Sequence, residues 1–487
     1  MKLVFTILIF LPFQTWSFAQ MHDNVWTMGY TCIPEDSSAF GGTNLYFRDG
    51  IMGEYVCRDI RFQSNCNASI SDYFGNLQLM FNGCTLNNAN NETVEGNEKL
   101  VRNDTDIEQT WWCDDGYNNP SGAMFLPDPY DEDRYYLFYR DLVMHPVSPY
   151  YVSDSFYVAE IIKDDESYYV GDKRAIVADT VSLTGLSAIR HANGKDWWVM
   201  VKNQHDNVFH NILVDEQGPQ LIHNQKIGNL DELISNGSTT KASPDGKYLA
   251  SFDPFFGLEI LSFDRVTGQF SEYNYIDNWI DVPKNIVLDI EFSPSGDYLY
   301  VAEIDTLWQF DMTVVPEDFF DSKVKVGIYD GFSDPFPVNF WLMQTAPDGK
   351  IYMSARNGAK FLHVIHNPNE NGLECDFQQH GFELPTVNAR GIPYFPNYRL
   401  GPDSTWLSTN VLTASTNKIY PNPATNTIQV TSDHNIEHII IYGAAGDAVL
   451  RSQDTEIDIS ALPEGMYFVH VVGRDGRLGV EKLVVMR

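Results

Sequence analysis

Basic residues are scarce in this chain of 487 residues, which has 32 Lys and Arg against 66 Asp and Glu and a formal net charge of −34. A surface with this balance repels polyanions, so we expect neither nucleic acid nor an anionic membrane as a partner. After the N-terminus no apolar run is long enough to span a bilayer. No long amphipathic helical period is present, and an aromatic content of 14% favours sheets.

Familiar catalytic motifs are also missing. The chain has no GxSxG elbow, no HExxH, no P-loop and no Rossmann glycine pattern, so we expect no enzyme of those classes and no cofactor. The candidate ligand-binding residues are His191, Trp197 and Trp198 in RHANGKDWW. An imidazole can act in acid–base chemistry and an indole can stack on a sugar. Because these residues flank a repeat turn, the better interpretation is a structural histidine and core packing for at least one of the tryptophans.

The six cysteines, few for this length, all follow the N-terminal apolar stretch. An even number in an oxidising compartment permits three disulfides, although six cysteines allow 15 connectivities. The favoured pair is Cys57–Cys66 because the enclosed loop is short, whereas Cys375 must pair across the fold or stay free. No CxxC spacing or histidine pair completes a zinc pattern, and the acidic clusters lack EF-hand spacing, so no metal site is expected. The cysteines are Cys32, Cys57, Cys66, Cys84, Cys113 and Cys375.

The N-terminus, MKLVFTILIFLPFQTWSFA, has one lysine, an apolar run and a small residue at its end. This pattern predicts a secretory signal peptide over residues 1–19, with cleavage between Ala19 and Gln20. The alternative is a membrane anchor. Pro12 and Gln14 interrupt the run, which is shorter than the ~18 apolar residues that a span needs.

Three similar stretches indicate the architecture: KASPDGKYLASF (241–252), EFSPSGDYLYVA (291–302) and TAPDGKIYMSA (345–355). Proline sets φ for the first central position of a type I turn, and a short polar residue follows it. Gly246, Gly296 and Gly349 then supply the left-handed residue of a three-residue hairpin. The apolar run after each glycine predicts a strand that is buried on both faces.

The spacing of these turns predicts a β-propeller. Gly194, Gly246, Gly296 and Gly349 follow one another at intervals of 52, 50 and 53 residues. Each interval holds about four strand-like runs, the number in a propeller blade. Weaker turns at Gly75 and near residue 133 extend the series. We therefore expect one propeller over residues 24–405, with seven blades, or six as the alternative. Strands near 44–47 and around 388–410 would form the seventh blade, closed by both ends of the chain.

These repeats resemble those of WD-like and PD-type β-propellers. Three stretches are also similar to secreted propellers of Gram-negative Bacteroidota: NASISDYFGNLQLMFNG, RHANGKDWWVMV and RGIPYFPNYRLGP. The resemblance covers roughly residues 24–405. It implies the fold and secretion, and it implies no ligand.

The end of the chain has a different composition. Residues 406–417 read as a polar linker, and short strands separated by Gly and Pro turns over 418–487 predict a small β-sandwich. This segment resembles the type A C-terminal sorting domain of the type IX secretion system. A carbohydrate-binding or immunoglobulin-like module is the alternative. The residues that carry the resemblance are Tyr420, Pro421, Asn422, Pro423, Ala424, Gly446, Gly465 and Tyr467.

Two classes of function follow from these features. The first is a non-catalytic propeller that binds an extracellular protein or glycan, and the second is an extracellular propeller enzyme, a hydrolase or lyase acting on a sugar, lactone or peptide. Converging carboxylates or histidines at the central channel would favour the enzyme, and an aromatic and amide-lined face would favour binding. Without a catalytic motif, we expect binding. The sorting domain implies the type IX machinery as a partner and the cell surface or exterior as the location.

Overall fold

The structure is a computed structural model in which the chain divides into two compact units. The first unit comprises Met1–His191 and Lys195–Gly401, and the second comprises Ala192–Gly194 and Pro402–Arg487. The described residues are 20–30, 40–48, 50–62, 65–101, 113, 115–144, 151–165, 167–183, 185–228, 239–253, 257–277, 289–315, 318–403, 417–432, 436–443, 448–452, 454–473 and 478–486. The predicted signal peptide, including Ala19, lies outside them, as do Cys32, Gly446 and most of the predicted linker.

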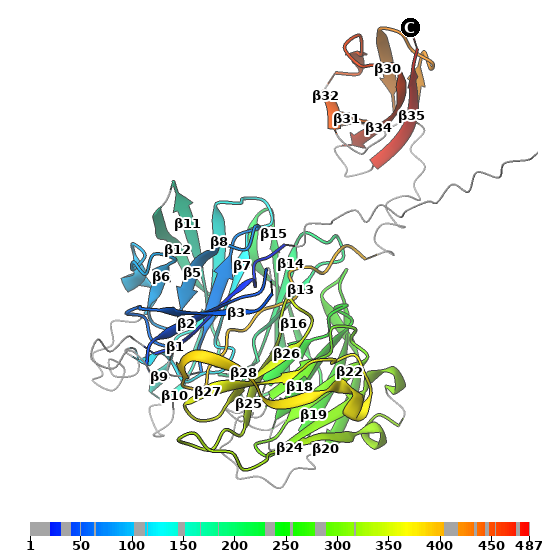
Figure 1. The fold of residues 1–487 in the computed structure, drawn as a ribbon. Coiled ribbons are helices and arrows are strands. Elements are labelled where there is room, and N and C mark those ends of the chain that lie inside the picture. Colours follow the sequence, from blue (N-terminus) through cyan, green and yellow to red (C-terminus); the bar gives the residue numbers. More distant parts are fainter. Residues whose placement is uncertain are drawn as a thin grey trace, which may run out of the picture. The chain divides into compact units, whose positions relative to one another are not determined.

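The first unit is a β-propeller, in which sheets that follow one another along the chain lie side by side (Figure 1). The first three sheets have three, three and four strands. A two-stranded sheet, β9 (Val143–Met144) with β10 (Tyr151–Val152), accompanies the third. The strands of the three sheets are β1 Val25–Gly29, β2 Gly42–Tyr46 and β3 Met52–Val56; β4 Ala68–Ser71, β5 Leu77–Phe81 and β6 Leu86–Asn88; and β7 Ala123–Pro127, β8 Arg134–Arg140, β11 Phe156–Asp164 and β12 Ser167–Val177.

The next four sheets are simple four-stranded antiparallel meanders. Their strands are β13 Ser187–Arg190, β14 Trp197–Lys202, β15 Val208–Asp215 and β16 Gly218–Lys226; β17 Thr239–Ala242, β18 Tyr248–Asp253, β19 Gly257–Asp264 and β20 Gln269–Asp277; β21 Asp289–Phe292, β22 Tyr298–Ala302, β23 Thr306–Asp311 and β24 Val324–Ile328; and β25 Phe340–Thr345, β26 Ile351–Ala355, β27 Ala359–Ile365 and β28 Phe377–Asn388. The described residues thus hold seven sheets of three or four strands in this unit. The number of blades stays a prediction.

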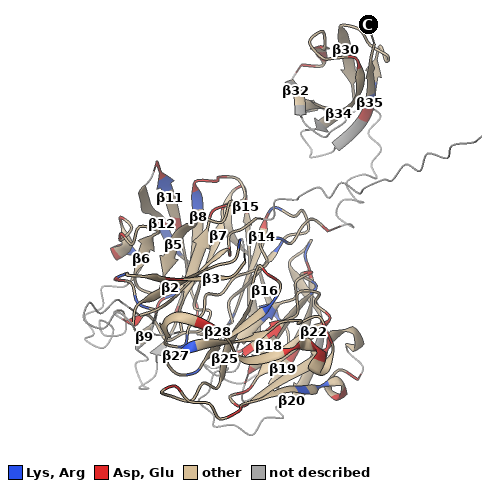
Figure 2. Ribbon diagram, in the orientation of Figure 1, with Lys and Arg blue, Asp and Glu red and all other residues tan. Residues whose placement is uncertain are grey.

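The described residues include four short 3₁₀ turns, and no helix among them is long and apolar enough to cross a membrane. The strands are mostly uncharged along their length, and the charged residues gather at strand ends and in loops (Figure 2). The 3₁₀ turns are η1 Asn97–Lys99, η2 Met312–Val314, η3 Phe320–Ser322 and η4 Gly372–Cys375.

The repeat turns have the predicted geometry. In each of the last four sheets of this unit, the turn joins the first strand to the second, and its glycine is left-handed, with φ between 72° and 80° at Gly194, Gly246, Gly296 and Gly349. The amide of Gly246 donates to the carbonyl of Ser243 at 2.9 Å, which closes the turn. An L side chain rarely adopts this backbone conformation, so glycine is the residue that the hairpin requires.

The prediction of a sheet shared by both chain ends was wrong. The run at 44–47 lies mostly in β2, whose sheet among the described residues consists of β1–β3, and no strand occurs between residues 389 and 403. Residues 404–410 of the predicted region lie outside the described residues. Two prolines, Pro393 and Pro396, interrupt this later stretch, and proline cannot donate to a strand ladder. The first and last sheets of the propeller are instead joined by side-chain contacts. The hydroxyls of Thr43 on β2 and Thr386 on β28, for example, form a hydrogen bond of 2.8 Å.

The second unit contains a small β-sandwich with its own core. One sheet has the order β29-β30-β33 and the other β32-β31-β34-β35. Alternate residues of their inner faces, such as Ile428, Ile441, Val469 and Leu483, pack together. The strands are β29 Lys418–Tyr420, β30 Thr427–Thr431, β31 Ile436–Tyr442, β32 Ala448–Ser452, β33 Glu456–Asp458, β34 Gly465–Gly473 and β35 Leu478–Val485.

The favoured disulfide, Cys57–Cys66, does not form. Cys66 is a free, buried thiol, Cys57 is bonded to another cysteine, and the described pair is Cys84–Cys113. Cys375 is also free and buried. Short sequence separation is a weak guide here, because Cys66 is buried in an apolar cluster with side chains from several strands, while Cys57 pairs elsewhere.

Removing the Cys84–Cys113 disulfide should destabilise the propeller. The bond joins residues 29 apart, and a cross-link of this span restricts the unfolded chain by about 2–4 kcal/mol. We expect Cys84→Ser/Cys113→Ser to lower the free energy of unfolding by that amount in urea titrations, with Cys66→Ala as the matched control. Non-reducing peptide mapping should give a Cys84–Cys113 linked peptide, and a Cys57–Cys66 peptide would contradict the structure.

Candidate functional site

Residues 389–401, which we call the axial segment, fill the centre of the propeller. They follow β28, have no regular secondary structure and carry three aromatic side chains, Tyr394, Phe395 and Tyr398, that are all nearly inaccessible to solvent. These rings belong to the largest apolar cluster, together with side chains from six of the seven sheets. A propeller without such a segment would leave the inner strand faces open to water.

The axial segment contacts the inner strand of one sheet after another. The amide of Phe395 donates to Gln344 on β25, the hydroxyl of Tyr394 to Ser187 on β13, and that of Tyr398 to the carbonyl of Phe125 on β7, at 3.2, 3.2 and 2.8 Å. Further contacts join it to three more of the inner strands or to residues directly before them: Trp26 of β1, Asn67 before β4 and Lys241 of β17.

The described N-terminus is tied to the same segment. Both guanidinium nitrogens of Arg399 donate to the carboxylate of Asp23, each at 2.6 Å, a bidentate pair. The ring of His22 packs edge-on against Tyr398, and Gln20 accepts a hydrogen bond from Arg190. The residue after the predicted cleavage point therefore lies beside the axis, while cleavage itself stays a prediction.

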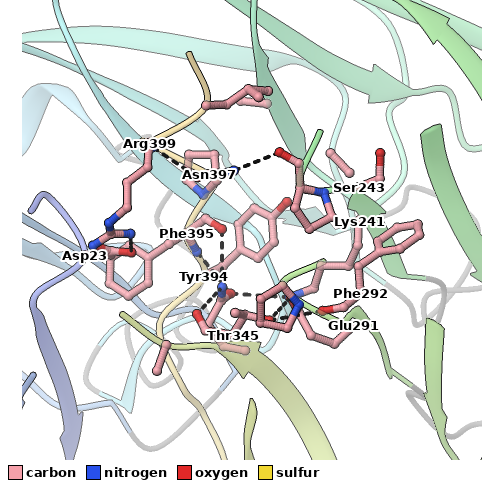
Figure 3. A pocket seen from close by; sticks show the side chains of 18 of the residues that line it. Asp23, Lys241, Ser243, Glu291, Phe292, Thr345, Tyr394, Phe395, Asn397 and Arg399 are labelled. Atoms are coloured by element: carbon pink, nitrogen blue, oxygen red, sulfur yellow. Dashed lines mark hydrogen bonds and ion pairs between the residues drawn. The ribbon is translucent and has the colours of Figure 1, made fainter. Parts of the chain in front are cut away.

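A pocket of about 310 Å³, the axial pocket, lies between the axial segment and four inner strands, β13, β17, β21 and β25. Figure 3 shows Tyr394, Phe395, Asn397 and Arg399 on one side of it, with Lys241, Ser243, Glu291 and Phe292 on the other. Its rim carries the three prolines of the repeat turns and one from the axial segment: Pro244, Pro294, Pro347 and Pro396. The turns that specify the fold therefore also border its pocket.

A buried ion pair lies at the base of the pocket. The ammonium of Lys241 is 2.7 Å from the carboxylate of Glu291, with both side chains less than 10% exposed, and it lies 4.6 Å from the ring centre of Tyr394. Burial disfavours the charge on Lys241, but Glu291 and Asp289 outweigh it and raise the pKa of Lys241 above its usual value. Burial raises the pKa of Asp289 to about 6, against the opposing effect of Lys241.

Each of the two carboxylates that line the pocket forms an ion pair with a basic side chain. Glu291 pairs with Lys241 and accepts from Thr345, and Asp23 pairs with Arg399. An acid–base catalyst needs a proton that it can exchange with a substrate, and these groups are held in internal contacts. In the described part of the chain, no group of three or more His, Cys, Asp or Glu is placed to hold a metal ion.

The three residues selected from the sequence are packed inside the propeller. His191 is 8% exposed, and its Nε2 lies 3.1 Å from the carbonyl of Val266. Trp197 is fully buried against Tyr398, and the indole of Trp198 donates to the carbonyl of Arg265. None of the three lines the axial pocket.

The residues at the base of the pocket escaped the sequence argument, although a signal for them exists. Lys241, Glu291 and Gln344 each lie three positions before the proline of a repeat turn, in KASP, EFSP and QTAP. Equivalent positions on neighbouring inner strands lie at the same level of a propeller, and the Nζ of Lys241 is within 3.3 Å of both Glu291 and Gln344. Aligning the repeats by their prolines would have brought these side chains together.

The sorting-motif residues anchor the start of the sandwich to its last strand. Asn422 donates to the carbonyl of Lys482 and accepts from the amide of Val484, and Ala424 continues the pairing with Val484. Tyr467 is buried and donates to the carbonyl of Pro463, whereas Tyr420 is 54% exposed. Gly465 opens β34, and Gly446 lies outside the described residues.

Comparison with known proteins identifies the last domain. Residues 418–486 match the secretion system C-terminal sorting domain. Curated protein sequences give no match. The protein is therefore exported through the type IX secretion system of Bacteroidota and is located at the cell surface or outside the cell.

Solved structures give distant likenesses. Chaetomium thermophilum Sqt1 is 11% identical, with 71% of this chain and 80% of that chain covered and a TM-score of 0.37. The Cps50 (Swd1) β-propeller domain of Myceliophteria thermophila is 11% identical, with coverages of 71% and 95% and a TM-score of 0.28. Kuenenia stuttgartiensis hydrazine synthase is 12% identical, with coverages of 88% and 94% and a TM-score of 0.36. At these scores the likenesses carry no argument on function.

Replacing Lys241 should be costly, and removing its partner as well should recover part of the loss. Lys241→Met leaves Glu291 buried without its cation, which typically costs 3–5 kcal/mol. We expect urea unfolding to show a loss of about this size for Lys241→Met and a smaller loss for Lys241→Met/Glu291→Met. Equal losses in the single and double variants would show that the ion pair is not what holds the base of the pocket together.

Proposed function

We propose that the exported propeller is a binding module for an extracellular protein or glycan and that its ligand enters the axial pocket. The observation that carries this proposal is the state of the two carboxylates that line the pocket, each of which is paired with a cation. The remainder of the lining is mostly aromatic, amide and aliphatic, with Phe292, Phe395 and Gln344 as examples, and it includes the hydroxyls of Ser243 and Thr345. Such a surface provides contact area and orientation, which is what recognition requires.

The alternative is a hydrolase or lyase acting on a sugar, lactone or peptide. Hydrolysis of a glycosidic bond, for example, generally requires two carboxyl groups facing the substrate, one of which holds a transferable proton. Asp23 and Glu291 lie on opposite walls of the pocket (Figure 3), and each carboxylate is held in an ion pair with a basic side chain. The geometry therefore supports binding over catalysis.

A direct test combines binding and turnover on the same secreted protein. The purified chain is applied to a glycan array and to a random dodecapeptide display library, and is incubated with nitrophenyl glycosides, glucono-δ-lactone and a casein substrate. We expect retained ligands and no turnover above that of Asp23→Asn/Glu291→Gln. Turnover that this double variant abolishes would contradict the proposal and establish the enzyme.

Deleting residues 418–487 should stop export without unfolding the propeller. The sorting domain is the part recognised by the secretion machinery, whereas the sheets of the propeller end at Asn388 and its axial segment at Gly401. We expect the truncated protein to accumulate in the periplasm, with a thermal unfolding midpoint for the propeller close to that of the full chain.

Cell fractionation and calorimetry read out the two expectations separately. The matched control is Tyr420→Ala, which changes an exposed motif residue without removing the sandwich. Delivery of the truncated protein to the cell exterior would refute the sorting role. We further propose that the sandwich is removed by cleavage in the linker before Ile419, whose Ser- and Thr-rich sequence suits a protease site. Terminal sequencing of the extracellular protein tests this.

A further inference from the structure

We propose that the axial pocket takes an apolar side chain presented by a protein or peptide, and not a sugar. This inference rests on the proposed binding function and narrows it to one class of ligand. Three features support it: the polar groups of the lining bond within the protein, the surfaces left for a ligand are apolar, and the mouth of the pocket is formed by turns that reach solvent.

Each polar side chain that lines the pocket forms hydrogen bonds or an ion pair within the protein. Lys241 contacts Glu291, Gln344 and the carbonyl of Met343, and Gln344 also bonds both backbone groups of Phe395. The other partners are Asp23 with Arg399, Asn397 with Pro244 and Arg399, Thr345 with Glu291, Ser243 with Asp245 and Tyr248, and Tyr394 with Ser187.

A sugar would lose hydrogen bonds to water on entering such a pocket. Its hydroxyls would have to displace internal contacts such as the 2.7 Å Lys241–Glu291 pair, or stay unpaired. An unpaired buried polar group costs about 1–3 kcal/mol. A sugar site generally presents polar side chains free to bond the ligand, whereas every polar side chain that lines this pocket already has at least one partner within the protein.

The surfaces that remain for a ligand are apolar. Phe292, Ile189, Ala346 and Leu400 line the walls, and the four prolines already described form the rim. Pro244, Pro294 and Pro347 are each half-buried and therefore accessible from solvent. The volume of about 310 Å³ is at the low end for ligand pockets, which span roughly 300–1,000 Å³. An apolar side chain can be removed from water in such a site, with the favourable free energy of burial, and it displaces no polar contact.

A side chain carried on a peptide suits the mouth of this pocket better than a free apolar molecule. The rim is built from the repeat turns, in which Asp297 and Asp348 are exposed to solvent. A backbone lying across these turns would place one side chain in the pocket and keep its own polar groups in water. This is the usual anchor arrangement, in which one buried residue supplies most of the binding energy.

The test uses the secreted full chain and two probes, a random dodecapeptide display library and a glycan array, followed by titration of single peptides. We expect the retained peptides to share an aliphatic or aromatic residue. Leu400→Ser, which removes an apolar wall, should weaken these peptides by at least about tenfold. Leu373→Ser is the matched control, because Leu373 is 78% exposed and does not line the pocket.

A second variant, Ala242→Phe, fills the pocket from the end of β17 and should abolish binding. Thermal unfolding of both variants checks that each is folded. Peptides without a shared apolar residue, or peptides unaffected by both variants, would overturn the inference. So would an array glycan that Ala242→Phe displaces, although that result would leave the proposed binding function standing. Failure of both probes together with turnover in the assay above would overturn the proposed function itself.

Discussion

Filling the axis is the constraint on which this propeller depends. Sheets arranged around a centre turn their inner strands toward one another, and the facing apolar side chains need something to pack against. Here the chain itself supplies the filling, in residues 389–401, whose aromatic rings join side chains from most of the sheets in one cluster. Because the segment is irregular, its backbone groups bond to inner-strand side chains and carbonyls in place of a ladder.

The pocket and its charges follow from the same arrangement. The axial segment forms one wall and the repeat turns form the other, so the binding surface exists only when both are in place. Arg399 ties this wall to Asp23 near the start of the described chain, and Lys241 is held between Glu291 and the ring of Tyr394. Buried pairs of this kind contribute little net stability, but they fix which side chains face each other. They leave an apolar opening surrounded by satisfied polar groups.

Much of the fold could be predicted because it is local and repeated. Pro244, Gly246 and their equivalents specify a turn that depends on backbone geometry alone, and their spacing specifies the sheet. The path of residues 389–401 could not be predicted, since it depends on contacts with strands more than a hundred residues away, such as Phe125 and Ser187. The same limit applies to Cys66, where three-dimensional packing overrides short sequence separation. The site residues Lys241 and Glu291 could be predicted in part. Aligning the repeats shows that they occupy equivalent positions, but their contact depends on how the sheets are arranged around the axis.

The account is tested most directly by urea unfolding of the full chain in which residues 389–401 are replaced by a Gly/Ser segment of equal length. Three aromatic side chains that pack at the axis are then lost, and each buried ring typically contributes 3–5 kcal/mol. We predict that the free energy of unfolding of the propeller falls by more than about 5 kcal/mol, or that cooperative unfolding disappears. A midpoint and slope equal to those of the unaltered protein would contradict the claim that this segment holds the ring together.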